Sequence, residues 1–87
     1  MTNCILIDRN NPTNTISAFD MSKCFQGHVE LCIIPDESRK YLEPYTKAKI
    51  IGSYVYARGV NSSFYPVELE DSLKTKVYVH ESYIIRT

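Results

Sequence analysis

Four residues near the start of the chain have side chains that could bind a metal ion together: Cys4, Cys24, His28 and Cys32. Three thiolates and one imidazole form a common tetrahedral shell for structural zinc. The spacing opposes such a site, because no Cys-x-x-Cys pair occurs and two residues four apart on one strand, as His28 and Cys32 would be, are separated by roughly 13 Å. We therefore predict buried, unreactive thiols and no metal or other cofactor. Whether the four residues converge stays open.

A cysteine beside a histidine could also act as a nucleophile with its base, and Cys24 with either His28 or His80 offers such a pair. This chemistry needs in addition a group that stabilises the oxyanion, and no segment of the sequence supplies one. Acidic residues that could act as paired carboxylates are scattered over predicted turns and alternating strand positions: Glu30, Glu68, Glu70, Asp71 and Glu81. We therefore predict that the protein is not an enzyme.

Tyrosine is the more informative residue type: Tyr41, Tyr45, Tyr54, Tyr56, Tyr65, Tyr78 and Tyr83. Because the side chains of a strand alternate between its two faces, Tyr54, Tyr56 and Arg58 share one face, and Val55 and Ala57 share the other. On one interpretation the rings cover the domain with their hydroxyls in water. Tyr and Arg are also enriched at the energetic centres of protein interfaces. On this second interpretation we predict contact with another protein, of unknown identity, through Tyr54, Tyr56, Arg58 and Tyr65, with Tyr41 and Tyr45 as additional contacts.

Single-stranded nucleic acid is the alternative partner, because tyrosine rings can stack on bases while basic side chains follow the phosphates. Lys47, Lys49 and Arg58 could line one end of such a surface, and Arg39 and Lys40 could add to it. Ten basic and ten acidic residues, however, give the chain a formal net charge of zero, which removes any long-range attraction to phosphates or anionic lipids. Nucleic acid is therefore the second choice, and its binding would need a local basic patch.

The chain has 87 residues, of which 44% are hydrophobic and 23% are charged, values typical of a globular domain. This length predicts one domain, spanning residues 1–87. The N-terminal segment has no basic leader and only four consecutive apolar residues, so we expect neither a signal peptide nor a membrane partner. Three cysteines then fit a reducing compartment, which favours a cytoplasmic protein. Frequent Ile and Asn with only three Ala suit an AT-rich genome, such as those of many bacteria and phages.

Apolar segments bounded by turn residues predict five strands, at residues 3–8, 28–34, 47–58, 64–69 and 75–85. The first should be central, because its Ile-rich sequence indicates burial on both faces. Gly52 marks a bend within the third, and Pro66 places the fourth at a sheet edge, because proline lacks the N–H that a second ladder requires. Residues 13–27 fit a short helix or a structured loop. Residues 36–42 fit a short helix capped by Asp36, or a connecting loop.

Five strands joined by short turns after one long connection predict a mainly β fold with one or two short helices, in the form of a small, partly open five-stranded barrel. From Gly27 onward, the order of a strand, a long loop and three turn-linked strands resembles the SH3-like barrels. This resemblance is architectural and, because the chain has no Trp, it does not imply the proline-motif groove of signalling SH3 domains. An α+β fold with a curved antiparallel sheet and one helix is the alternative. The oligomeric state stays open.

Overall fold

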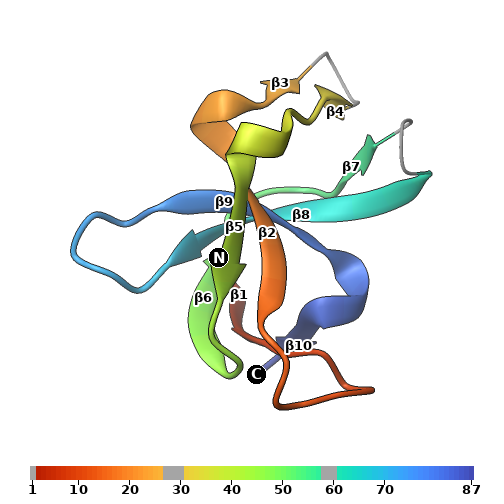
Figure 1. The fold of residues 1–87 in the computed structure, drawn as a ribbon. Coiled ribbons are helices and arrows are strands. Elements are labelled where there is room, and N and C mark those ends of the chain that lie inside the picture. Colours follow the sequence, from red (N-terminus) through yellow and green to blue (C-terminus); the bar gives the residue numbers. More distant parts are fainter. Residues whose placement is uncertain (1, 27–30, 58–60) are drawn as a thin grey trace.

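Apolar segments of the chain form strands. The computed structural model describes residues 2–26, 31–57 and 61–87. Ten strands lie in these residues (Figure 1): β1 (Thr2–Leu6), β2 (Ile16–Asp20), β3 (Phe25–Gln26), β4 (Leu31–Ile33), β5 (Arg39–Leu42), β6 (Thr46–Ile50), β7 (Val55–Ala57), β8 (Ser62–Leu69), β9 (Lys76–His80) and β10 (Ile84–Arg86). Three short 3-10 helices connect some of them: η1 (Met21–Lys23), η2 (Asp36–Ser38) and η3 (Glu81–Tyr83). No helix of the described residues is long and apolar enough to cross a lipid bilayer.

Eight of these strands form one antiparallel sheet, in the order β10-β1-β6-β8-β9-β2-β5, with β7 also paired to β8. The other two, β3 and β4, pair only with each other and lie at the top of Figure 1. The main sheet is open, with β10 and β5 as its edges. The prediction of a mainly β fold is therefore confirmed. The count of five strands is wrong, because the main sheet alone has eight.

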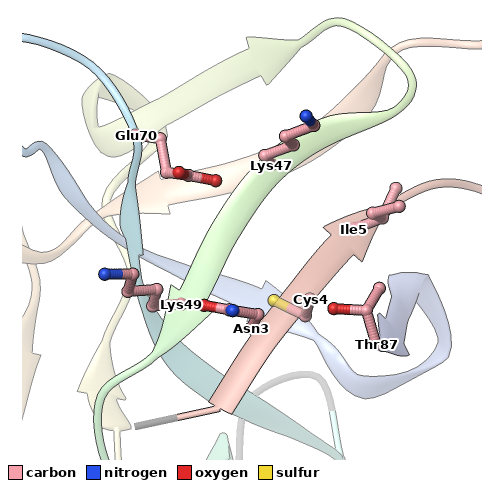
Figure 2. A pocket seen from close by; sticks show the side chains of 7 residues that line it. All are labelled: Asn3, Cys4, Ile5, Lys47, Lys49, Glu70 and Thr87. Atoms are coloured by element: carbon pink, nitrogen blue, oxygen red, sulfur yellow. The ribbon is translucent and has the colours of Figure 1, made fainter.

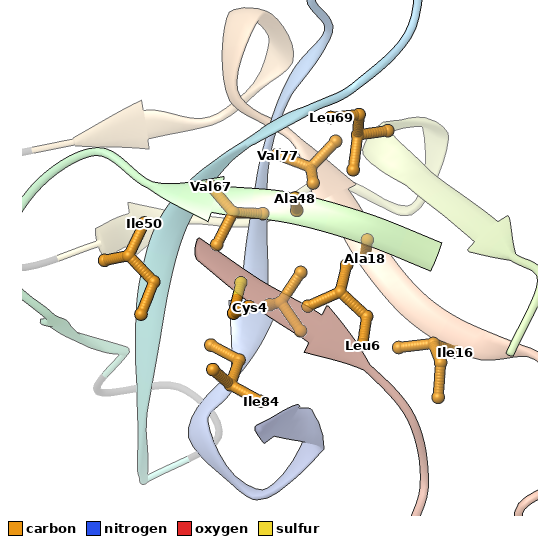
Figure 3. Packing of buried hydrophobic residues seen from close by; sticks show 11 residues of the cluster. Cys4, Leu6, Ile16, Ala18, Ala48, Ile50, Val67, Leu69, Val77 and Ile84 are labelled. Atoms are coloured by element: carbon orange, nitrogen blue, oxygen red, sulfur yellow. The ribbon is translucent and has the colours of Figure 1, made fainter. Parts of the chain in front are cut away.

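One face of the main sheet, here called the inner face, curls around the larger hydrophobic core. The buried side chains of this core come from six strands (Figure 3): Cys4, Leu6, Ile16, Ala18, Ala48, Ile50, Val67, Leu69, Val77, Val79 and Ile84. Ile84 belongs to edge strand β10, whereas Ile16 belongs to β2, next to the opposite edge. Residues this far apart in a sheet share one cluster only if the sheet is strongly curved, as the twist of β-strands permits.

The outer face has a second, smaller hydrophobic cluster over β2, β8 and β9. Phe19, Phe64 and Tyr78 form its aromatic part, and Phe19 meets Phe64 edge to face with 5.7 Å between the ring centroids. Val55 and Ala57 of β7 complete the cluster, and partly buried side chains pack at its rim: Met21, Cys24 and Ile34. The strands β2, β8 and β9 are therefore buried on both faces, so their sequences lack the alternation of a half-exposed strand.

Burial on both faces explains why the helix or loop predicted for residues 13–27 is wrong at Ile16–Asp20, which form β2, whereas Met21–Lys23 do form a short 3-10 helix. Ile16 and Phe19 stand three apart, as they would on one side of a helix. The chain instead forms β2, which places Ile16 in the inner core and Phe19 in the outer cluster. Two unrelated burial sites thus produced a helical spacing by coincidence.

The segment after β4 also differs from its prediction. Asp36–Ser38 form only the single turn of η2, and Pro35, not Asp36, is the N-cap residue. The following residues, predicted to continue a helix or loop, form β5 and pair with β2. The strand predicted for residues 28–34 is present as β4, while residues 27–30 lie outside the described part of the chain.

The strand predicted for residues 47–58 is divided into β6 and β7, which pair with different parts of β8. Gly52 lies in the break between them, and a Cβ added there would lie 3.3 Å from Cγ of Pro66. Pro66 is thus in a central strand, and the edge prediction is wrong. The strand tolerates it because N and O of a strand residue face the same side: the Pro66 carbonyl accepts from the N–H of Ile51 at 3.0 Å, so its nitrogen faces the break.

The closing run predicted as one strand, residues 75–85, is divided by η3 into β9 and β10. His80 caps this turn through Nδ1, which accepts a hydrogen bond from the N–H of Ser82 at 3.1 Å. The turn lets one apolar run pair first with β2 and β8 and then with β1. As predicted, β1 is central, between β10 and β6. Its outer face is not buried, since Asn3 is exposed and Ile5 only partly covered.

Lys74, in the hairpin between β8 and β9, has a backbone conformation that glycine adopts more easily. Its φ is +50°, in the left-handed region that costs other residues roughly 1–2 kcal/mol. We expect Lys74→Gly to raise the free energy of unfolding by up to about 1 kcal/mol, because relief of this strain exceeds the larger entropy loss of glycine. Urea unfolding measures the gain. Lys74→Ala, which keeps the Cβ, is the control, and an equal gain for alanine would contradict the explanation.

Candidate functional site

Tyr54, Tyr65 and Arg86 form a stack of side chains at one end of the curled sheet. The rings of Tyr54 and Tyr65 meet edge to face with 6.0 Å between their centroids. The guanidinium carbon of Arg86 lies 5.1 Å from the centroid of the Tyr65 ring, a cation–π distance. Tyr65 is partly buried against the inner core, whereas Tyr54 is 59% exposed. The stack therefore has an anchored base and an accessible outer ring.

The local sequence explains why Tyr54 and Tyr56 point outward. Val55 and Ala57 are buried in the outer cluster, so the residues that alternate with them point away from it. Tyr56 is 36% exposed, and its hydroxyl donates a hydrogen bond to Oδ1 of Asn61 in the turn before β8. The alternation predicted for residues 54–57 is confirmed.

Arg86 supplies a cation to this site that the sequence did not indicate. Arg58 lies outside the described residues. Sequence reasoning missed Arg86 because it lies on β10, far along the chain from the tyrosines. The available signal was weak: Arg86 stands two residues after Ile84, which is buried in the inner core, and therefore shares its face at the strand end.

Tyr41 and Tyr45, the two additional contacts predicted, are 64% and 62% exposed but belong to another part of the sheet. Tyr41 lies on edge strand β5, opposite Ser17 of β2. Tyr45 lies in the turn between β5 and β6, where its N–H donates to the carbonyl of Leu6 at 2.9 Å. In the sheet, β5 is separated from β8 by β2 and β9. The structure therefore brings Tyr54 and Tyr65 together, with Tyr56 beside them along β7, and leaves these two elsewhere.

The cysteines that the structure describes do not converge. Cys4 is in the inner core and Cys24 is at the rim of the outer cluster, on opposite faces of the sheet. His28 and the side chain of Cys32 lie outside the described residues. Within the part of the chain that is described, no three His, Cys, Asp or Glu side chains are placed to hold a metal ion. Burial raises the pKa of the Cys4 and Cys24 thiols, which keeps them protonated and weakly nucleophilic.

His80, the other histidine considered as a base, has a structural role. Its Nδ1 accepts the capping hydrogen bond of η3 and lies 2.7 Å from the hydroxyl oxygen of Ser82. Its ring packs edge to face on Phe64 with 5.4 Å between centroids. Nδ1 is therefore occupied by the cap in the folded domain.

Lys47 and Lys49 lie on the outer face of β6 and line a cavity of about 470 Å³ (Figure 2). The other lining residues come from β1 and from the segments after β8 and β10: Asn3, Cys4, Ile5, Glu70 and Thr87. Glu70 lines the same cavity as both lysines and offsets part of their charge. The cavity thus has little net charge with which to hold a phosphate backbone.

Two further cations predicted to bind nucleic acid, Arg39 and Lys40, are on β5 and are already engaged, whereas Arg58 lies outside the described residues. The guanidinium of Arg39 lies over the ring of Phe19, 5.4 Å from its centroid. Nζ of Lys40 lies 3.9 Å from a carboxylate oxygen of Asp20. These residues and the lysines of β6 therefore do not form one basic surface with the tyrosine stack.

Comparison with known proteins does not identify the chain, since no protein family model, no curated protein and no solved structure matches it.

Proposed function

We propose that the protein is a non-enzymatic binding module that docks onto a larger protein through a tyrosine surface, defined as Tyr54, Tyr56, Tyr65 and Arg86. The observation that carries this proposal is the stack in which Tyr65 lies between Tyr54 and Arg86, at ring distances of 6.0 and 5.1 Å. Tyrosine and arginine, together with tryptophan, are enriched among the residues that dominate the binding energy of protein interfaces.

Preorganisation supports a binding role for this surface. The ring of Tyr54 already contacts Tyr65, which packs against the inner core, so a partner would immobilise few additional rotamers. Val55 and Ala57 hold the backbone of β7 in the outer cluster. The rings supply apolar area and the hydroxyls supply hydrogen bonds. This combination suits a surface that is exposed to solvent in the free protein and buried in a complex.

The chemistry of the tyrosine surface indicates what it would recognise. Tyr54 offers an exposed aromatic ring to an apolar side chain, while the exposed guanidinium of Arg86 offers a cation at the edge of the stack. A partner with an apolar side chain next to a carboxylate would satisfy both groups, because arginine binds carboxylates through paired hydrogen bonds.

We also propose a finer description of the fold and of the setting in which the protein acts. The order of the turn-linked strands that follow β5 supports a variant of the SH3-like barrel. The AT-rich bias of the composition and the free thiols of Cys4 and Cys24 support a small accessory or inhibitor protein of a bacterium or phage, working in the cytoplasm.

Site-specific photo-crosslinking in a lysate of the native host tests the proposed function. A photoreactive phenylalanine in place of Tyr54 should form a covalent adduct with one protein, because this ring is the exposed part of the stack. The same group in place of Tyr41, which is equally exposed but lies on β5, should form no such adduct. Adducts at Tyr41 alone would contradict the proposal. So would a nuclease-sensitive adduct that disappears steeply with added salt, as phosphate contacts do.

A further inference from the structure

A second surface lies at the other end of β8, beside the hairpin that leads to β9. An open hollow of about 560 Å³ there is lined by three lysines from separate segments, namely Lys40 of β5, Lys74 of the hairpin and Lys76 of β9. Among the described residues that line it, Asp20 is the acidic one. A chain whose formal net charge is zero thus has a local excess of positive charge, which the fold assembles from positions far apart in the sequence.

The carboxylate of Asp20 is already engaged within the protein. It accepts hydrogen bonds from the N–H of Ser22 at 3.0 Å and from its hydroxyl at 2.7 Å, and Nζ of Lys40 lies 3.9 Å away. These hydrogen bonds, with a smaller effect of Lys40, lower the pKa of Asp20. Asp20 thus remains charged but neutralises only one of the three lysines.

The two lysines of the hairpin side reach the solvent, although Lys74 also borders a smaller hollow of about 180 Å³ that contains Glu68, Glu70 and Asp71. Lys74 and Lys76 are exposed. The nearby carboxylate of Asp71 is occupied by the N–H and hydroxyl of Thr75, at 2.9 and 2.8 Å. Glu68 stands opposite Lys76 in the β8–β9 register. Its negative charge weakens the positive potential of Lys76 on the outer face, but Glu68 does not line the hollow.

Apolar contacts lie within the same hollow. Leu73, at the tip of the hairpin, is 84% exposed and lines it together with the partly buried Met21. A single exposed leucine needs no explanation by itself. Leu73 and Met21 line the same hollow as the three lysines. The hollow therefore offers both apolar contacts and positive charges, which an acidic peptide with an apolar side chain can use.

We propose that this lysine hollow binds an acidic segment of a protein, one that carries an apolar side chain among its carboxylates. The carboxylates would face Lys74 and Lys76, and the apolar side chain would pack between Leu73 and Met21. A single-stranded nucleic acid fits less well, because no aromatic ring on which a base could stack is among the described residues that line the hollow. This surface is independent of the tyrosine surface and adds a second contact to the molecule.

Fluorescence anisotropy with a defined probe tests the proposal on the full chain. The probe is a labelled nine-residue peptide of Glu with Leu at every third position, compared with the same peptide carrying Ala in place of Leu. The leucine peptide should bind more tightly. The double variant Lys74→Glu with Lys76→Glu should weaken its binding by at least about tenfold, because two attractive charges become repulsive. Leu73→Ala should weaken the leucine peptide and leave the alanine peptide unchanged.

A matched charge reversal elsewhere provides the control. Lys47→Glu changes the net charge by the same amount as Lys76→Glu alone, but on the outer face of β6, where Lys47 lines another cavity. Lys47→Glu should leave peptide binding within about twofold, whereas Lys76→Glu alone should weaken it. A second pair, Lys74→Gly with Lys76→Ala, removes the two charges without strain in the hairpin and should reproduce the loss in a folded protein. Equal losses in the control, or tighter binding of a single-stranded oligonucleotide through the same lysines, would overturn the proposal.

Discussion

Tyr78→Ala is expected to lower the free energy of unfolding by about 3–5 kcal/mol, the range for truncating a buried aromatic side chain. Tyr78 is 2% exposed and stands between Phe19 of β2 and Pro66 of β8 in the sheet register. Its loss would open a cavity in the outer cluster, which holds β7 against the sheet. A domain of 87 residues is stable by roughly 4–13 kcal/mol, so the variant should lose much of its stability. Urea unfolding followed by circular dichroism measures the difference.

Tyr78→Phe is the matched control, because it keeps the ring and removes only the hydroxyl. Its expected cost is about 1 kcal/mol, and a similar small cost for alanine would contradict the packing role. Burial raises the pKa of Tyr78, so the folded state holds the phenolic proton more tightly than the unfolded chain does. The resulting stability is complete below the unfolded-state pKa of about 10 and is lost as the pH rises through the folded-state pKa. Tyr78→Phe should lack this part of the alkaline loss.

The parts of the fold that could be predicted from the sequence are those with one face in water. Residues 54–57 alternate visibly, because Val55 and Ala57 are buried while the tyrosines between them are exposed. In β2 and β9 the signal is absent, since Phe19 and Tyr78 bury the outer face while Ala18 and other small residues bury the inner one. When both faces of a strand are buried, its apolar residues follow no regular period. Their spacing in β2 and β9 is therefore compatible with a helix or with one long strand.

Long-range pairing explains the remaining errors. The lack of a donor in proline predicts an edge position for Pro66. The requirement for an unpaired nitrogen is met in the central strand, because the Pro66 nitrogen faces the break between β6 and β7. What the sequence could not show is that one strand would have two successive partners on one side. In the same way, Arg86 contacts Tyr65, and Lys40 and Lys74 line one hollow, although the residues of each pair are far apart in the sequence.

Tyr54→Ala combined with Tyr56→Ala is expected to abolish capture of the protein partner while the domain stays folded. Truncation of an interface tyrosine at a binding hot spot costs about 2 kcal/mol or more, so the pair should weaken binding roughly a thousandfold. The cost in folding stability should be about 1 kcal/mol or less, because both rings are largely outside the core and the Tyr56 hydrogen bond is exposed. Quantitative pull-down and urea unfolding measure the two effects separately.

Tyr41→Ala combined with Tyr45→Ala is the matched control, because it also removes two tyrosines, and both are at least as exposed as Tyr54. If exposed tyrosines act only as a general covering of the surface, the two double variants should behave alike. If the stack on Tyr65 is the binding surface, only the first should lose the partner, because only Tyr54 is held in a fixed geometry by another ring. Full capture by the folded Tyr54/Tyr56 variant would exclude the tyrosine surface, whatever its effect on stability.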